Sequence, residues 1–156
     1  GPMLAKGLAG LLNKPHWGDL DYLIVDFPPG TGDVQISMSQ KLKLDGTLIV
    51  TTPQLLSLKD VVRGINMFIK VGVPILGVVE NMSYLEEDNQ KKYIFGESKT
   101  KSILLKENVS LIEELPFNLN IPKSCDEGKP YCFDYKDEYS KQFENITSAI
   151  TNKFNN

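Results

Sequence analysis

The sequence predicts an α/β fold in which a parallel sheet is flanked by helices. Short apolar runs of five or six residues, bounded by proline, glycine or acidic residues, are typical of strands buried in a parallel sheet. Amphipathic stretches lie between these runs, and alternating strands and helices favour parallel pairing with right-handed crossovers. Since no internal repeat and no domain boundary is visible, residues 1–156 are predicted to belong to a single domain.

The predicted elements follow one another along the whole chain. Strands are predicted at residues 20–25, 47–51, 75–80 and 111–115, and helices at residues 4–12, 33–40, 57–70, 98–107 and 137–153. The helix at 57–70 has the clearest apolar stripe, and Ser57 is predicted to cap it, with Asp60 three residues later. Residues 86–92 are predicted to form a polar surface excursion and residues 117–135 a loop, because the latter contain two prolines and a glycine.

Composition limits the classes of partner. The chain has 17 basic and 20 acidic residues, and because no basic stripe is visible, nucleic acid is not an expected partner. No apolar run approaches the length of a membrane span and no signal-type segment opens the chain, so no membrane association is expected. The two cysteines make no disulfide framework and favour a reducing compartment. We expect a cytoplasmic location, with an organellar stroma or matrix as the alternative.

Asp26 is the first candidate for chemistry. It follows the apolar run 20–25, and the carboxyl ends of parallel strands face the crevice where open α/β sheets bind ligands. In phosphate hydrolases an acidic residue at this position commonly holds Mg²⁺, often through a water molecule. Taken alone, Asp26 is equally consistent with a carboxylate that caps a loop.

The residues after Asp26 favour the functional alternative. The loop consists of Pro28, Pro29, Gly30, Thr31 and Gly32. Two prolines stiffen the backbone, and two glycines allow the main chain to approach a phosphate closely. A plain turn needs less constraint than this. Asp33 is predicted to cap the helix that follows.

Other candidates lie after the strands predicted at 75–80 and 111–115. Asn81 carries a carboxamide, which has both a donor and an acceptor for an adenine edge, although an asparagine that closes a turn is commoner. Pro116 and Phe117 lie at the same sheet edge and can press on a base, or they simply end a strand. Cys125 and Cys132 have six residues between them and belong to no Cys-x-x-Cys pair, so free thiols are expected.

Several segments together resemble the Mrp family of P-loop ATPases. They occur in the family's order and at similar spacing from end to end. They are residues 20–35 (LDYLIVDFPPGTGDVQ), 50–54 (VTTPQ), 71–74 (VGVP), 79–83 (VENMS), 93–96 (YIFG) and 126–130 (DEGKP). The resemblance implies a deviant P-loop NTPase fold of the MinD/ParA type, of which this chain would be the C-terminal portion, with the N-terminal part missing.

The resemblance also implies roles for individual residues and ligands. Asp26 would organise the Mg²⁺ shell, Gly30 would lie where the γ-phosphate is sensed, and Asn81 and the loop at Pro116 would touch adenine. The family's members are iron–sulfur cluster carriers and scaffolds that work as homodimers. The implied ligands are therefore ATP, Mg²⁺ and a [4Fe-4S] cluster that bridges two subunits, and the implied partners are proteins that donate or receive clusters.

Two features depart from the family's pattern. No Gly-x-x-x-x-Gly-Lys-Ser/Thr segment occurs in the 156 residues, so the phosphates would lack their backbone cradle. The family's Cys-x-x-Cys is replaced by the polar residues 86–92, as in the plastid high-chlorophyll-fluorescence branch, which this chain resembles most. The best remaining candidate for a cluster ligand is Cys125.

Three functions follow from these observations. The leading expectation is an ATPase for iron–sulfur cluster assembly, a nucleotide-binding hydrolase and cluster chaperone when intact. The second is a positioning ATPase of the ParA/MinD type, which needs a membrane-targeting helix or a DNA-binding patch that the sequence does not display. The third is a non-enzymatic interaction fragment. This chain alone is expected to have no meaningful ATPase activity.

Overall fold

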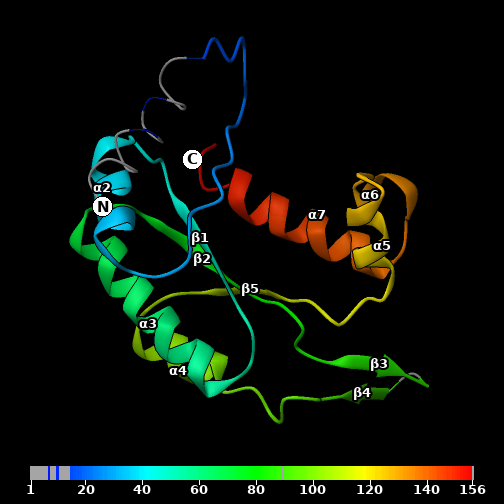
Figure 1. The fold of residues 1–156 in the computed structure, drawn as a ribbon. Helices are drawn as coiled ribbons and strands as arrows, with labels where there is room; N and C mark the ends of the chain where they lie inside the picture. Colours follow the sequence, from blue (N-terminus) through cyan, green and yellow to red (C-terminus); the bar gives the residue numbers. More distant parts are fainter. Residues whose placement is uncertain (1–6, 8–9, 11–14, 89, 156) are drawn as a thin grey trace.

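The computed structural model describes residues 7, 10, 15–88 and 90–155 (Figure 1). Its helices are α2 (Asp33–Lys41), α3 (Leu55–Lys70), α4 (Thr100–Lys106), α5 (Asn120–Asp126), α6 (Tyr131–Asp134) and α7 (Glu138–Thr151). Its strands are β1 (Thr47–Thr51), β2 (Ile75–Glu80), β3 (Leu85–Glu87), β4 (Gln90–Lys92) and β5 (Leu111–Glu114). The helix predicted at 4–12 falls mostly outside the described residues. None of the described helices has the length and apolar character needed to cross a membrane.

The main sheet is parallel, as predicted, with the strand order β1-β2-β5. Thr51 of β1 lies opposite Glu80 of β2, and Glu80 lies opposite Glu114 of β5. The carboxyl ends of the three strands are therefore level with one another. This register places the loops after the three strands at one edge of the sheet.

Helices cover both faces of this sheet (Figure 1). Successive residues of a strand point to opposite faces, and Val78 and Val79 of the central strand β2 accordingly enter two different cores. Val78 packs with residues of α3 and α4, namely Val61, Ile65 and Leu104. Val79 packs with Leu115 and with residues of α6 and α7, namely Tyr131, Tyr139 and Ile146. The apolar run at 75–80 predicted β2 because both faces of this strand are buried.

The predicted helix starts need correction. Ser57 lies inside α3, whose N-cap is Gln54, and its hydroxyl lies 2.8 Å from the Thr52 hydroxyl instead of capping the helix. Asp33 is the first residue of α2, and Gly32 occupies the N-cap. A cap residue keeps a non-helical backbone, as Gln54 does with its ψ of 136°, and side-chain type alone does not reveal which residue does so.

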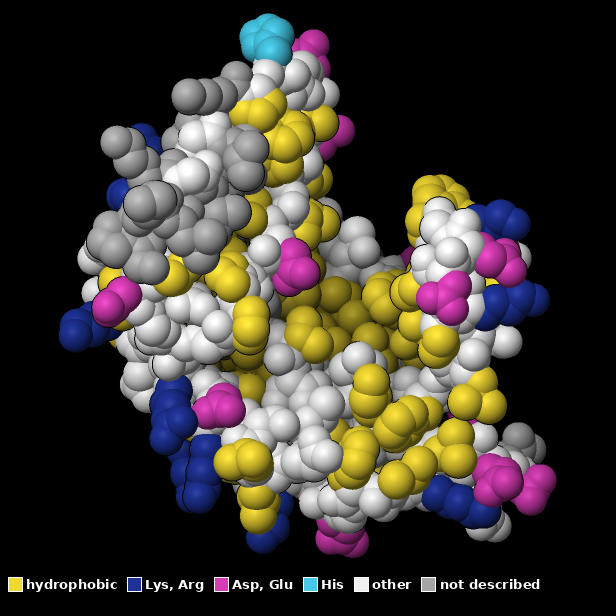
Figure 2. Space-filling view, viewed as in Figure 1, with side chains coloured by type: hydrophobic (Ala, Val, Ile, Leu, Met, Phe, Trp, Pro, Cys, Tyr) yellow, Lys and Arg dark blue, Asp and Glu magenta, His cyan; other side chains and the backbone are white. Residues whose placement is uncertain are grey.

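The strand predicted at 20–25 does not form. The main sheet contains β1, β2 and β5 only, and a strand requires a neighbouring backbone with which to pair. Leu20, Tyr22, Leu23 and Ile24 of this segment are exposed, most of all Ile24 at 92%. Figure 2 shows hydrophobic side chains along this part of the molecule and in the hollow beside it. β1 is the terminal strand of this sheet, and its Val50 has 60% of its surface accessible.

The loop predicted at 117–135 contains two short helices, α5 and α6. Pro122 lies in the first turn of α5, where a helix has no use for its backbone donor, and Pro130 is the N-cap of α6. The prolines therefore shape the helix starts instead of preventing helices. The polar residues 86–92 form the antiparallel hairpin β3–β4, whose turn includes Asp88 with a φ of 52°.

Candidate functional site

Backbone hydrogen bonds join the loops at the carboxyl edge of the sheet. The Asn81 N–H donates to the Thr51 carbonyl at 2.7 Å, and the Ser83 N–H donates to the Leu115 carbonyl at 2.9 Å. The Phe117 N–H donates to the Tyr84 carbonyl at 2.7 Å. The end of β1 and the loops that follow β2 and β5 are thereby connected. The predicted adenine contacts Asn81, Pro116 and Phe117 are brought together at this edge.

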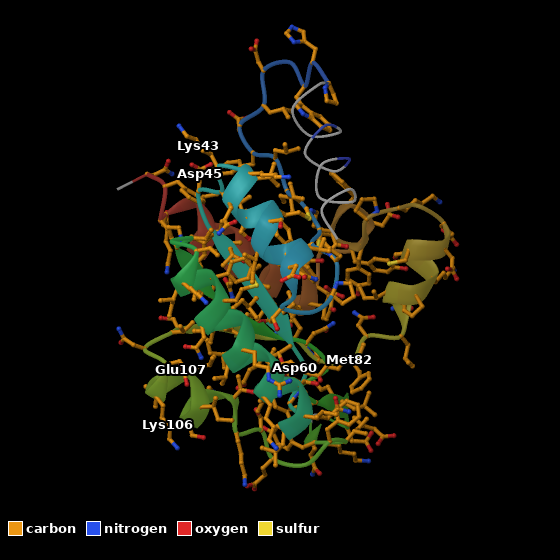
Figure 3. The ribbon with its side chains drawn as sticks, turned by 60° about the vertical axis from the view of Figure 1, so that its left-hand side comes forward. Lys43, Asp45, Asp60, Met82, Lys106 and Glu107 are labelled. Carbon is orange, nitrogen blue, oxygen red and sulfur yellow. The ribbon has the colours of Figure 1, made fainter. Side chains whose placement is uncertain are left out.

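The side chain of Asn81 stabilises its own loop. Its Oδ1 accepts a hydrogen bond from the Met82 N–H at 2.9 Å, and Met82 has a φ of 56°. Met82 itself is exposed beyond the end of β2 (Figure 3). Phe117 packs against Phe95 with ring centroids 5.8 Å apart. The carboxamide oxygen thus serves the turn, while an aromatic pair borders the same edge.

Glu80, which sequence reasoning did not select, is the most constrained polar group of this edge. Its exposure is 0%. Its Oε1 accepts from the Ser83 hydroxyl at 2.8 Å, and its Oε2 accepts from the Ser98 hydroxyl at 2.5 Å and from the Thr100 hydroxyl. Burying a carboxylate is costly unless hydrogen bonds compensate, and here three hydroxyls do so.

The sequence contains a signal for Glu80. It is the charged residue of an otherwise apolar strand, Ile-Leu-Gly-Val-Val-Glu. A carboxylate in such a strand needs partners, and the nearby Ser83 is an obvious one. The partners Ser98 and Thr100 are 18 and 20 residues away, so only the fold shows that they reach it.

The loop 28–32 is held by a residue that sequence reasoning also missed. Gln35 of α2 is buried, and its Nε2 donates to the Pro28 carbonyl at 3.0 Å and to the Pro29 carbonyl at 2.5 Å. Gly30, the next residue, has a φ of 104°, which side-chain-bearing residues rarely adopt. The loop therefore has a defined conformation that depends on one amide side chain.

Asp26 precedes this loop and is exposed. No hydrogen bond or ion pair to its side chain is present in the part of the chain that the structure describes. An accessible carboxylate beside a glycine-containing loop is a donor set that suits Mg²⁺ and phosphate. The neighbouring Phe27 packs against Phe68 of α3, with ring centroids 6.3 Å apart. This contact directs the segment toward α3.

The predicted site residues thus form two groups. The contacts of the segment 26–32 run to α2 and α3, whereas those of Asn81, Pro116 and Phe117 run along the carboxyl edge of the sheet. Within residues 15–88 and 90–155, no hydrogen bond joins one group to the other. The structure assembles each group but does not join them into one site.

Neither cysteine forms a disulfide. Cys125 is exposed and Cys132 is half-buried. Neither belongs to a group of three or more histidine, cysteine or acidic side chains suited to a metal ion among the described residues. A closed metal centre is therefore not formed by the described part of one chain.

The chain is similar in sequence to known proteins over most of its length. A sequence model of the family described as ParA: NUBPL iron-transfer P-loop NTPase matches residues 1–151. An iron-sulfur cluster carrier protein of Aquifex aeolicus is 40% identical over 97% of this chain and 42% of its own length. The iron-sulfur cluster transfer protein NUBPL of Dictyostelium discoideum is 43% identical over 96% of this chain and 47% of its own. The chain thus spans less than half the length of these relatives.

Two solved structures share the fold. A nucleotide-binding protein of Archaeoglobus fulgidus in complex with ADP has a TM-score of 0.72 and 37% identity, over 81% of this chain and 53% of that one. The cell division ATPase MinD of Pyrococcus furiosus has a TM-score of 0.69 and 22% identity, over 96% of this chain and 57% of that one. The second likeness concerns the fold alone. Together they confirm the MinD/ParA-like architecture that the sequence predicted.

Proposed function

Since the chain belongs to the ParA family of NUBPL-type iron-transfer P-loop NTPases, we propose that it is the C-terminal portion of a nucleotide-dependent iron–sulfur cluster carrier. The observation that carries this proposal is the match of residues 1–151 to that family, together with relatives named as cluster carriers that align to nearly the whole chain. The alternative of a MinD-type positioning ATPase is supported only by the fold.

In this proposal the loop 28–32 responds to the nucleotide's phosphates. Asp26 would hold Mg²⁺ through water, and the bound ion would supply positive charge that offsets the charge of the phosphates. The hydrogen bonds from Gln35 to the loop hold the backbone next to Gly30. Because so few bonds set this conformation, a bound phosphate could change it, which supports a phosphate-sensing role. The ADP complex of the Archaeoglobus relative makes ATP or ADP the nucleotide to test.

Asn81, Pro116 and Phe117 would contact the adenine. Their loops are joined by backbone hydrogen bonds at the carboxyl edge of the sheet, which is the edge where α/β proteins bind ligands. A base entering there would meet the aromatic ring of Phe117 and the amide group of Asn81. For one nucleotide to contact all of these residues, its binding would have to bring the segment 26–32 close to Asn81, Pro116 and Phe117.

The cargo in this proposal is a [4Fe-4S] cluster carried between two copies of the protein. The cluster is received from a donor protein and passed to a recipient protein. The cytoplasm is the proposed location, and an organelle is the alternative, since a relative of Arabidopsis thaliana, 50% identical over 83% of this chain, is named as a mitochondrial protein required for NADH dehydrogenase.

The test uses the intact gene product, purified without oxygen. Iron and acid-labile sulfide are measured per chain, and the bound cluster is then offered to an apo-ferredoxin. We expect retained iron and sulfide in equal amounts, and transfer to the acceptor. A gene product that retains neither after anaerobic reconstitution contradicts the carrier function.

Hydrolysis is tested separately from cluster carriage. Because the 156 residues contain no Gly-x-x-x-x-Gly-Lys-Ser/Thr segment, we expect the chain alone to show no ATP turnover above buffer. Phosphate release is measured with the intact gene product as the reference. Comparable turnover by the two would mean that the phosphate-binding elements lie within these residues.

A further inference from the structure

A cavity of about 470 Å³ lies among α5, α6 and α7, and both cysteines line it. Its walls are mainly apolar. The residues that line it include Ile121, Cys125, Lys129, Pro130, Cys132 and Phe143. Two thiols that are seven positions apart in the sequence therefore face one space.

The turn between α5 and α6 brings the two thiols to this cavity. The Gly128 N–H donates to the Cys125 carbonyl at 3.1 Å, and Gly128 has a φ of 66°, which ends α5 in the manner of a left-handed cap. The Lys129 N–H then donates to the Ser124 carbonyl at 2.9 Å. The chain thereby reverses at the end of α5 and starts α6 beside it.

The core fixes the second thiol. Tyr131, which precedes Cys132, is buried in the cluster that includes Val79 and Ile146, and Cys132 packs against the same cluster. Tyr139 belongs to the same cluster, and its burial there raises the pKa of its phenol. Cys132 is thus held in place, whereas Cys125 is presented at the surface.

We propose that Cys125 and Cys132 are the thiolates through which this part of the protein holds its iron–sulfur cargo. This inference rests on the proposed function. Iron–sulfur clusters are held by cysteine thiolates, and the 156 residues contain only these two. One chain therefore fills two of the four ligand positions of a [4Fe-4S] cluster, and a second copy fills the other two.

The cavity suits this cargo. Apolar walls restrict the access of water to a cluster, and Lys129 supplies a positive charge beside thiolate-bound iron, which carries net negative charge. Loading from a donor is a ligand exchange. Each thiol releases its proton to solvent as its sulfur bonds to iron, and each departing ligand takes up a proton, while the oxidation states of the iron atoms do not change.

The experiment offers the chain a synthetic [4Fe-4S] cluster ligated by a small thiolate, without oxygen. Iron, sulfide, visible absorbance and oligomeric state are measured after desalting. We expect about four iron and four sulfide per two chains, in a dimer. Cys125→Ser and Cys132→Ser are each expected to reduce retention by roughly tenfold or more, and the double variant is expected to retain none.

Two controls separate the site from general effects of thiols and folding. Adding Ser102→Cys and Ser148→Cys to the double variant restores two thiols at exposed positions that do not line the cavity, and this variant is expected to remain unloaded. Circular dichroism checks that each variant is folded, and Cys125→Ser, at an exposed position, decides the question if Cys132→Ser unfolds.

Two results would overturn the inference. One is a wild-type chain that retains no cluster, and the other is a Cys125→Ser/Cys132→Ser double variant that loads as well as wild type. The same substitutions in the intact gene product distinguish a wrong ligand assignment from a wrong proposed function. If its cluster survives both substitutions, the carrier function stands and the ligand assignment fails, whereas a gene product with no cluster contradicts both.

Discussion

The Ser98 hydroxyl donates to the Glu80 carboxylate at 2.5 Å, across 18 residues of sequence. Ser83 donates to the other oxygen of the same carboxylate. Ser83 and Ser98 flank residues 84–97, which include the hairpin β3–β4, so both ends of this excursion are attached to one buried group. Asn81, a proposed nucleotide contact, lies between Glu80 and Ser83. The base of the hairpin and the proposed adenine contact therefore share one anchor.

Thr100→Val tests this anchor. It removes a hydroxyl that donates to a buried carboxylate, and we expect a loss of about 2 kcal/mol in the free energy of unfolding, since hydrogen bonds to charged groups have this magnitude. Thr100→Ser keeps the hydroxyl and is expected to lose less. Ser102→Ala, on the exposed side of the same helix, is the control. Urea unfolding measures all three, and equal losses for Val and Ser would contradict a role for the hydroxyl.

Gln35→Ala tests how the loop 28–32 is held. The substitution removes both amide hydrogen bonds to Pro28 and Pro29, and we expect a loss of about 1–2 kcal/mol in stability. Amide hydrogen exchange at Gly30 and Thr31 is expected to accelerate, because the loop loses its fixed conformation. Gln40→Ala, at an exposed position of the same helix, is the matched control and should change neither quantity. Unchanged exchange in Gln35→Ala would show that the loop is held by other contacts.

Gly77→Ala tests the tight contact between β2 and β5. A Cβ at this position would lie 2.6 Å from Cγ1 of Ile112, and its backbone has a φ of 149°. We expect a loss of about 2 kcal/mol or more, because both the contact and the conformation oppose a side chain. Gly64→Ala is the control with the opposite expected sign. A Cβ at Gly64 would have no atom within 4 Å, and alanine in the middle of α3 should raise the free energy of unfolding by up to about 1 kcal/mol. Thermal unfolding of both variants measures these changes in stability. A Gly77→Ala variant as stable as wild type would contradict the close packing of β2 against β5.

Asp137→Asn tests a pH-dependent contribution. The Asp137 carboxylate accepts from the Tyr131 hydroxyl at 2.6 Å and caps α7 through the Ser140 N–H at 3.0 Å, and the Tyr131 bond is the main reason that the pKa of Asp137 is lowered. A lowered pKa in the folded state stabilises the fold above the ordinary value of about 4, and this contribution is lost as the pH falls below it.

We therefore expect the stability of wild type to exceed that of Asp137→Asn by about 1 kcal/mol or less at pH 7, and this difference to shrink as the pH falls below the ordinary carboxyl range. Urea unfolding at several pH values measures the difference. Glu138→Gln, which alters an exposed ion pair with Lys141 in the same first turn, should stay within about 0.5 kcal/mol of wild type at pH 7. A wild-type advantage that grows toward low pH would show that the charged carboxylate does not stabilise the fold.

Much of the architecture could be predicted because it depends on local pattern. The bounds of β1 and β2 were predicted correctly from their short apolar runs, and β2 is buried on both faces. The segment 20–25 has the same pattern but forms no strand, because pairing depends on a neighbouring backbone and not on the segment itself. The helices in 117–135 were missed because proline was taken as a breaker, whereas at Pro122 and Pro130 it occupies helix starts.

The sequence by itself determined the family, the alternation of strands and helices, and the identity of the residues available for chemistry, because motifs and periodicity are properties of neighbouring residues. Only the tertiary structure decided which of these residues meet. It placed Ser98 and Thr100 on the buried Glu80 carboxylate, Gln35 on the loop 28–32, and both thiols in one cavity. Such contacts depend on how distant segments pack together, and no local sequence pattern contains that information.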